Sequence, residues 1–233
     1  MMTKFYGIGV GPGDPELITI KGVKALEKID VLYLPETKKG EKGVAHQIVE
    51  PYLKANLQIE KIGFPMVKDE EIFIKAGKEA ARAIEQHINN GKNVAFVTLG
   101  DPSIYSTYGY ILKNLSQSIA VETIPGITSF CAAAAMANQP LVERDQVLSI
   151  LPMNAKDEQI NQVLSHSDVF AFLKIYNRET RVLEHIRQHN MVHNSILVEK
   201  CGFNESKIHT NIQEALTNNK EYLTLLLSKK GGQ

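Results

Sequence analysis

The opening of the chain constrains the fold more than any other segment. In FYGIGVGPGDPELITI, residues 5–20, glycine occupies every second position from Gly7 to Gly13, and Asp-Pro follows. The apolar run at residues 3–10 predicts a short strand, and apolar side chains at helical spacing predict a helix at residues 20–29. A strand, a glycine-rich loop and a helix in this order open nucleotide-type sites in α/β proteins.

The rest of the first half continues this alternation. Short apolar runs predict strands at residues 31–34, 58–63 and 94–99, and the last is apolar on both faces, as in the centre of a parallel sheet. Helices are predicted near residues 45–53 and from residue 70 to 88, the second with Asp69 as its N-cap and Asn90-Gly91 as its stop. We predict an N-terminal α/β domain with a parallel sheet, residues 1–117.

The second half predicts another α/β domain, residues 118–233, with a mixed sheet. Strand-like runs occupy residues 119–124, 146–151, 169–175, 195–200 and 222–228. Helix-like segments lie between them at residues 130–138, 155–165, 178–190 and 211–218. The pattern of strand-like and helix-like segments changes at residues 115–119, where we place the boundary between the two domains.

Composition excludes several classes of protein. Lys plus Arg equals Asp plus Glu at 26 each, so the charge gives no reason to expect nucleic acid or a membrane surface as partner. Cys131 and Cys201 lie far apart, without the spacing of a zinc site. No apolar run approaches the roughly 20 residues of a membrane helix, and residues 1–10 lack the layout of a secretory signal. We expect a soluble, cytoplasmic protein.

Three loops follow predicted strands and combine glycine with proline: GVGPGDP, LGDPSIYSTY and IPGITSF. Ligands of open α/β sheets bind beyond the carboxyl ends of strands, and each loop leads towards a helix start with free N–H groups. Each loop taken alone can equally be a tight turn without a ligand. Three such loops together favour a binding site.

The spacing of the glycines argues against two familiar sites. A dinucleotide fingerprint needs G-x-G-x-x-G, but the sixth position from Gly7 is Pro12 and from Gly9 it is Asp14. A P-loop is absent because no GK[ST] follows the glycines. These loops therefore predict a site for a nucleoside without a phosphate chain.

GIGVGPGDPELITIKG, VTLGDPSIYSTY and IPGITSF, in this order, resemble the tetrapyrrole methylase family, the class III S-adenosylmethionine-dependent methyltransferases. The resemblance covers nearly the whole chain and implies two α/β domains with a ligand cleft between them, S-adenosyl-L-methionine as methyl donor and a homodimer. GDPSIYSTY and the FPM loop at residues 64–66 most resemble the branch that methylates carbon-20 of precorrin-2 or its cobalt form in cobalamin biosynthesis. Other tetrapyrrole or non-tetrapyrrole acceptors within the family, and a nucleotide-binding oxidoreductase, are the alternatives.

The resemblance also implies residues that bind the donor. Relatives often have Met at the position of Leu173 and Gly at that of Cys201, so the chain departs from the family where the adenine would lie. The implied residues are Pro12, Leu99, Gly100, Asp101, Ile104, Thr128, Ser129, Leu173 and Cys201.

Asp101 and Tyr105 are the candidates for a base that removes a proton from the methylated carbon. The alternative for Asp101 is structural, since an Asp before Pro often ties its own loop through backbone N–H groups. The acceptor's carboxylates require cations, and Lys174, Arg144 and Arg178 are the predicted substrate-binding residues. Lys38, Lys39 and Lys200 are further candidates, and for each cation the alternative is a solvated surface charge.

The spacing of three histidines and a run of alanines could indicate a metal site and a dimer contact, but each has a simpler explanation. His185, His189 and His193 are spaced by four, but the predicted helix ends near Asn190 and no carboxylate or cysteine completes a metal site, so we predict surface histidines and no metal. The alanine run at residues 132–135 predicts a closely packed core helix, with a dimer contact as the alternative.

Overall fold

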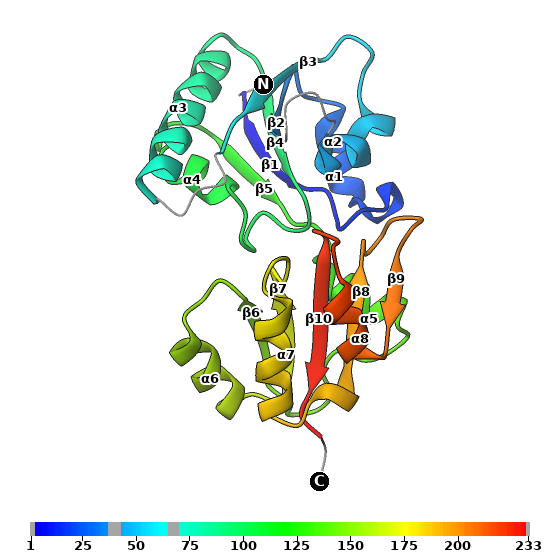
Figure 1. Cartoon of the computed structure of the whole chain (residues 1–233). Helices are drawn as coiled ribbons and strands as arrows, with labels where there is room; N and C mark the ends of the chain where they lie inside the picture. The colour runs from blue at the N-terminus through cyan, green and yellow to red at the C-terminus, as the bar shows by residue number, and fades with distance from the viewer. Residues whose placement is uncertain (1–2, 37–42, 65–69, 232–233) are drawn as a thin grey trace. The chain divides into compact units, whose positions relative to one another are not determined.

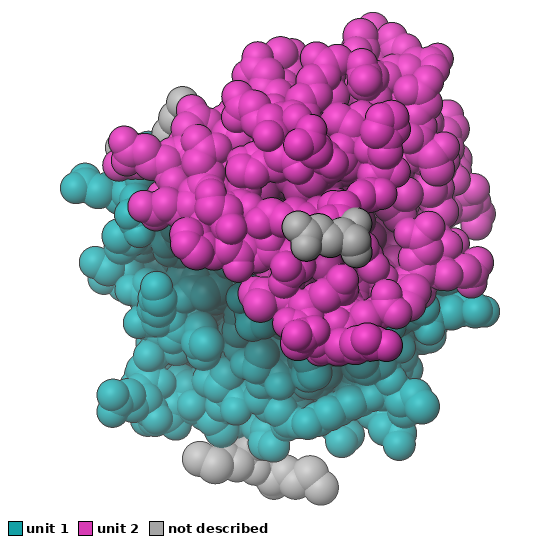
Figure 2. Space-filling view, turned by 90° about the horizontal axis from the view of Figure 1, so that it is seen from below, with its two compact units in different colours: residues 1–128 teal, residues 129–233 magenta. Residues whose placement is uncertain are grey.

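The computed structural model describes residues 3–36, 43–64 and 70–231. The chain forms two compact units, residues 1–128 and 129–233, which Figure 2 colours separately. Within the described residues, no helix is long and apolar enough to cross a membrane. Of the sequence predictions, the Asp69 cap, Pro65 and Met66 of the FPM loop, Lys38 and Lys39 lie outside the described residues.

The first unit is a parallel sheet with helices on both faces (Figure 1). Its strands stand in the order β3-β2-β4-β1-β5, and every neighbouring pair is parallel. Its elements are β1 (Phe5–Gly9), α1 (Ile20–Leu26), β2 (Val31–Pro35), α2 (Val44–Val49), β3 (Gln58–Ile62), α3 (Glu70–Asn89), β4 (Val94–Thr98), α4 (Tyr108–Leu112) and β5 (Val121–Ile124), with short 3-10 turns at Pro15–Leu17 and Glu50–Tyr52.

Alternation along the central strands fills two cores. On β4, Ala95 and Val97 face the helices α1 and α2, whereas Val94 and Phe96 face α3 and α4. All of β4 is buried because both faces are covered, which explains its continuous apolar sequence. The prediction of a doubly wound parallel sheet is confirmed.

The second unit holds a mixed sheet in the order β6-β7-β10-β8-β9. β6 and β7 are parallel, and the other neighbours are antiparallel. Its elements are α5 (Ser129–Met136), β6 (Leu148–Pro152), α6 (Asp157–His166), β7 (Val169–Leu173), α7 (Glu179–Gln188), a 3-10 turn (Val192–Asn194), β8 (Ser195–Glu199), β9 (Lys207–His209), α8 (Ile212–Asn218) and β10 (Thr224–Lys229).

The second core lies between this sheet and the helices α6, α7 and α8. Phe170, Phe172 and Leu226 from the strands pack there with apolar residues of the three helices. Figure 1 shows α5 behind the sheet, opposite α7 and α8. Residues 132–134 of α5 are buried, which supports the core interpretation of the alanine run.

The structure corrects the boundary between the units. The sequence predicts the strand at residues 119–124 as part of the second domain, but β5 pairs in parallel with β1, so the first unit continues to Thr128. Pairing with a strand more than a hundred residues away leaves no local trace in sequence, which explains the error. The short elements α4 and β9 were not predicted.

Candidate functional site

Three loops leave one edge of the first sheet, because β1, β4 and β5 are parallel and end there. A Cβ atom added to Gly126 would lie 2.1 Å from the carbonyl oxygen of Gly100 and 2.7 Å from the carbonyl carbon of Gly9. One added to Gly9 would lie 2.6 Å from the Gly126 nitrogen. Contacts within the protein therefore require glycine at positions 9 and 126. We call Gly9, Gly100 and Gly126 the glycine junction.

Hydrogen bonds also join the first loop to the second. Gly100 N donates to Gly11 O over 2.7 Å, and Gly11 N donates to Gly100 O over 3.3 Å. Both residues have left-handed backbone, with φ of 83° at Gly11 and 69° at Gly100, which glycine adopts without a Cβ penalty. Pro12 is buried next to this bridge. Position 7 requires glycine for a different reason, since a Cβ there would lie 2.2 Å from the Tyr108 ring.

Asp101 ties the second loop to the third. Its Oδ1 accepts from Ser103 N over 2.8 Å and from the Ser103 hydroxyl, and its Oδ2 accepts from Gly126 N over 2.9 Å. Burial alone would raise the pKa of Asp101, but these hydrogen bonds outweigh it and the pKa lies below its ordinary value. An ionised, fully engaged carboxylate is a weak base, so the geometry favours the loop-tying interpretation.

Two features of this edge fit a bound polar molecule. Thr128 Oγ1 is buried and has no hydrogen-bond partner among the described residues. Such a hydroxyl costs about 1–3 kcal/mol unless a ligand or water uses it. No described atom lies within 4 Å of a Cβ built on Gly100, so this main chain borders open space. Leu99, at the start of the second loop, packs on the apolar core. Ile104 belongs to the same loop, and its N–H donates to Asp101 O over 3.3 Å.

Tyr105 is a large aromatic residue of this loop and is 51% exposed. Its φ of 50° is unusual for a bulky residue and marks a constrained backbone. Partial burial raises the pKa of the Tyr105 phenol above its ordinary value, so the hydroxyl keeps its proton near pH 7.

The second sheet has one edge where three strands end. β7 and β8 both run antiparallel to β10, and β6 runs parallel to β7, so the carboxyl ends of β6, β7 and β8 share that edge. Leu173 ends β7. Cys201 follows β8 and its Sγ lies 3.6 Å from the Ser129 carbonyl oxygen. Burial raises the pKa of the Cys201 thiol to about 11, which keeps it protonated. Ser129 and Cys201, both predicted to bind the donor, are therefore in contact.

The predicted substrate-binding cations do not all share this edge. Lys174 directly follows β7 with a φ of 59°, and Arg178 immediately precedes α7. The pKa of Lys174 lies below its ordinary value, chiefly because the ammonium is partly buried. The positive charge of Arg178 is the second cause, and it acts on Lys174 because the two cations lie close together. Arg144 lies in the turn before β6, at the amino end of that strand. The structure brings Lys174 and Arg178 together and leaves Arg144 at the opposite edge.

The three histidines are not alike, and the prediction of surface histidines is wrong for His185. Its side chain is buried, with Nε2 3.2 Å from Asp157 Oδ1. Arg181 contacts the same carboxylate and donates to the carbonyl oxygens of Met153 and Ala155, so this cluster holds the loop after β6. Among the described residues, no three His, Cys, Asp or Glu side chains gather closely enough to hold a metal ion.

A family model described as Tetrapyrrole (Corrin/Porphyrin) Methylases matches residues 4–216, which include both edges. The chain belongs to this family. The resemblance seen in the three loops is thereby confirmed, together with the α/β fold class and the assignment to an enzyme family of methyltransferases.

Relatives of this tetrapyrrole methylase carry specific names. The probable cobalt-precorrin-2 C(20)-methyltransferase of Methanocaldococcus jannaschii is 37% identical over 76% of this chain and 74% of its own. The precorrin-2 C(20)-methyltransferase of a Sinorhizobium species is 30% identical over 96% of this chain and 94% of its own. The uroporphyrin-III C-methyltransferase of Thermus thermophilus, solved with S-adenosylhomocysteine, shares the fold with a TM-score of 0.70, 18% identity and coverage of 97% and 92%.

Sequence reasoning missed some residues of this methylase that organise the loops. Ser103 and Gly126 bind the Asp101 carboxylate but were not predicted as its partners. The Asp-Pro-Ser order was an available signal, because Asp commonly accepts a hydrogen bond from the backbone two residues on. The contact with Gly126 joins distant loops and has no such signal.

Proposed function

We propose that this tetrapyrrole methylase transfers a methyl group from S-adenosyl-L-methionine to carbon-20 of precorrin-2 or of its cobalt form, in cobalamin biosynthesis. The observation that carries the proposal is that the relatives from M. jannaschii and Sinorhizobium, similar over most of the chain, are both named for this position. One is named for the cobalt form and the other for precorrin-2 itself, so both acceptors are to be tested.

The proposal assigns donor binding to loops of both units. The glycine junction presents main chain, and Pro12, Leu99 and Ile104 add apolar surface, which suits the nucleoside part of the donor. The unpartnered Thr128 hydroxyl supports a hydrogen bond to the donor. The ionised Asp101 carries a negative charge that favours a sulfonium cation nearby. Ser129, Cys201 and Leu173 are the proposed contacts from the second unit.

The sulfonium donor supplies an already reactive methyl group, so the chain needs no strong nucleophile. Its residues act by orientation, and holding two reactants in line can lower a barrier by several kcal/mol. The Asp101 hydrogen bonds fix the loop that carries Tyr105. We propose that the neutral Tyr105 phenol donates a hydrogen bond to the acceptor, and that Lys174 and Arg178 bind its carboxylates.

The Thr128→Val variant tests the donor site, because it removes the hydroxyl at nearly constant volume. S-adenosylhomocysteine should bind about five- to tenfold more weakly, the loss of one neutral hydrogen bond. The free energy of unfolding without ligand should not fall, because the hydroxyl has no protein partner. Thr217→Val is the matched control, since Thr217 is exposed and its hydroxyl donates to Gln213 O within α8. Calorimetric titration and urea unfolding measure both; unchanged affinity in Thr128→Val would remove this residue from the site.

The acceptor is tested by incubating the enzyme and S-adenosyl-L-methionine separately with precorrin-2 and with its cobalt form, followed by mass spectrometry. A gain of one methyl group on either acceptor supports the proposal and decides between them. If neither gains a methyl group while another tetrapyrrole does, the acceptor is a different one.

We also propose that the enzyme acts as a homodimer in the cytoplasm. The support is the resemblance to the family, and sedimentation equilibrium of the purified chain tests the oligomeric state. A mass equal to one chain at micromolar concentration would contradict it.

A further inference from the structure

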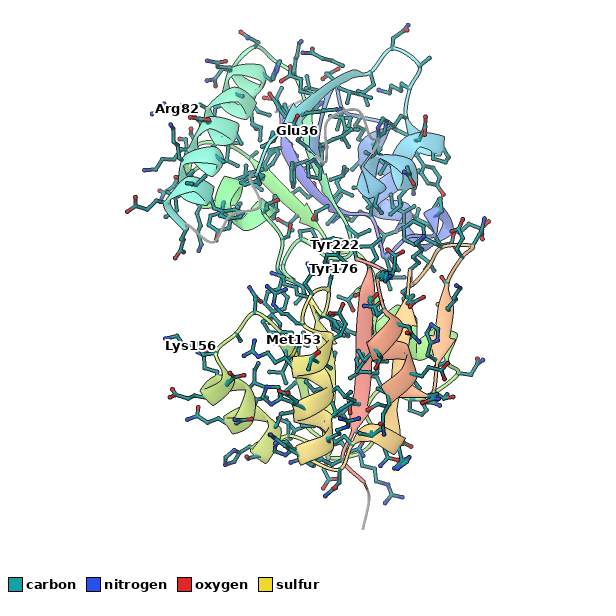
Figure 3. All side chains as sticks on the ribbon, viewed as in Figure 1. Glu36, Arg82, Met153, Lys156, Tyr176 and Tyr222 are labelled. Atoms are coloured by element: carbon teal, nitrogen blue, oxygen red, sulfur yellow. The ribbon has the colours of Figure 1, made fainter. Side chains whose placement is uncertain are left out.

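Tyr176 and Tyr222 form an aromatic pair at the carboxyl edge of the second sheet (Figure 3). Their ring centroids are 5.7 Å apart with an edge-on interplanar angle of 68°. Tyr176 lies in the loop after β7, and Tyr222 lies just before β10, which pairs with β7. The Tyr222 side chain is 59% exposed although its ring is large and largely apolar. A paired, exposed ring of this kind offers contact area to a partner.

The two loops that carry the rings are fixed to each other. Glu179 Oε1 accepts from Asn177 N over 3.1 Å and from Asn219 Nδ2 over 3.1 Å, so one carboxylate joins both loops. The Tyr222 loop is held further by Asn219 Oδ1, which accepts from Glu221 N. Arg178 Nη1 donates to Tyr176 O over 3.0 Å. The pair is therefore preorganised, and binding against it requires little ordering of these loops.

Two cations are close to Tyr176 in the sequence. Lys174 and Arg178 lie two residues to either side of Tyr176 in the same loop. Lys174 and Asn177 have left-handed backbone with φ of 59° and 60°, a conformation that costs about 1–2 kcal/mol for a non-glycine residue. Strained backbone that presents charged side chains is typical of binding sites. Lys200, just after β8, forms an ion pair with Glu221 at 3.3 Å.

We propose that Tyr176 and Tyr222 form a stacking platform for the pyrrole rings of the acceptor, with Lys174 and Arg178 binding its carboxylates. This inference rests on the proposed function and deepens it. An extended, anionic ring system matches both an aromatic surface and two nearby cations. The adenine of the donor is neutral and matches only the aromatic surface, which makes it the weaker candidate.

Tyr222→Ser and Tyr222→Phe separate ring from hydroxyl. Absorbance titration measures binding of the cobalt form of the acceptor, and calorimetry measures binding of S-adenosylhomocysteine. Tyr222→Ser should weaken acceptor binding about tenfold and raise KM more than it lowers kcat, because one aromatic contact is lost. Tyr222→Phe should retain wild-type affinity, and both variants should bind S-adenosylhomocysteine like the wild type.

Arg178→Gln tests the charge, with Arg187→Gln at the other end of α7 as the matched control. Arg187 Nη2 bonds Gln213 and lies away from the platform. Only Arg178→Gln should weaken acceptor binding, and added salt should reduce the difference between variant and wild type.

The outcomes separate this inference from the function on which it rests. Wild-type enzyme that neither binds nor methylates the tetrapyrrole overturns the proposed function and the platform with it. Wild-type activity with unchanged acceptor affinity in Tyr222→Ser overturns the platform alone. A fall in S-adenosylhomocysteine affinity in that variant would assign the rings to the donor instead.

Discussion

The loop edges of the two units solve the same conformational problem with different residues. In the first unit, left-handed backbone is supplied mainly by Gly11 and Gly100, with Tyr105 as the exception, and three loops touch through their main chains. In the second unit, the same region of φ is occupied mainly by residues with side chains, Lys174, Asn177 and Lys200, with Gly202 as the glycine. Lys174, Asn177 and Lys200 keep a side chain where glycine would be least strained, as Tyr105 does in the first unit, so the side chains at these positions have another use.

This difference indicates that the loop edges of the two units suit different ligands. At the glycine junction, the described residues of the first edge present main chain with the Asp101 carboxylate beside it, which suits a compact nucleoside held closely. The second edge presents lysine, arginine and tyrosine, which suit a large anionic ring system. The predictions below test this contrast, from the largest expected effect to the smallest.

Gly126→Ala should break the glycine junction. Its Cβ would lie 2.1 Å from Gly100 O, against main chain that cannot rotate away, so the loops must separate. We expect a loss of unfolding free energy of about 3 kcal/mol or more and no detectable S-adenosylhomocysteine binding. Urea unfolding and calorimetry measure these losses.

Gly109→Ala is the control for this change, because no described atom lies within 4 Å of its added Cβ and it sits in helix α4. It should be neutral or stabilising by up to about 1 kcal/mol. Equal stability of the two variants would show that the junction tolerates side chains.

Asp101→Asn should loosen the contact between the second and third loops. The amide cannot accept from both Ser103 and Gly126 as the carboxylate does, so we expect a loss of about 2 kcal/mol in stability and weaker donor binding. Exposed Asp145→Asn is the control.

The Asp101 contribution also predicts a pH dependence. Because the folded pKa of Asp101 lies below its unfolded value, its stabilisation is fully present above the unfolded pKa and is lost as pH falls through the folded one. The stability difference between wild type and Asp101→Asn should therefore shrink in acid. A difference that stays constant down to pH 2 would contradict the assignment of the shift to this carboxylate.

Lys174→Gly should separate stability from function. Glycine relieves the φ of 59° and should stabilise the fold by up to about 1 kcal/mol, while the lost ammonium raises KM for the acceptor. Thermal unfolding and steady-state kinetics measure the two effects. A variant that is both less stable and fully active would mean that Lys174 has a structural role.

The sequence predicts those features that depend on local pattern. Alternation in β4 and the helical stripe of α3 identify buried elements, and the three loops identify the family. The pairing of β5 with β1 and the contact between Gly9 and Gly126 join segments over a hundred residues apart, so no local pattern reveals them. Buried His185 contacts Asp157 of another helix, and this contact also has no local pattern in the sequence. Left-handed lysine likewise has no sequence signal, since glycine is the residue that normally indicates it.

Transfer of an isotopically labelled methyl group from S-adenosyl-L-methionine to the cobalt form and to precorrin-2, with the product carbon assigned by NMR, tests the central claim most directly. The account predicts a single labelled methyl group on carbon-20 of one of these acceptors. A label on any other carbon, or no transfer to either acceptor by folded enzyme that binds S-adenosylhomocysteine, would contradict it.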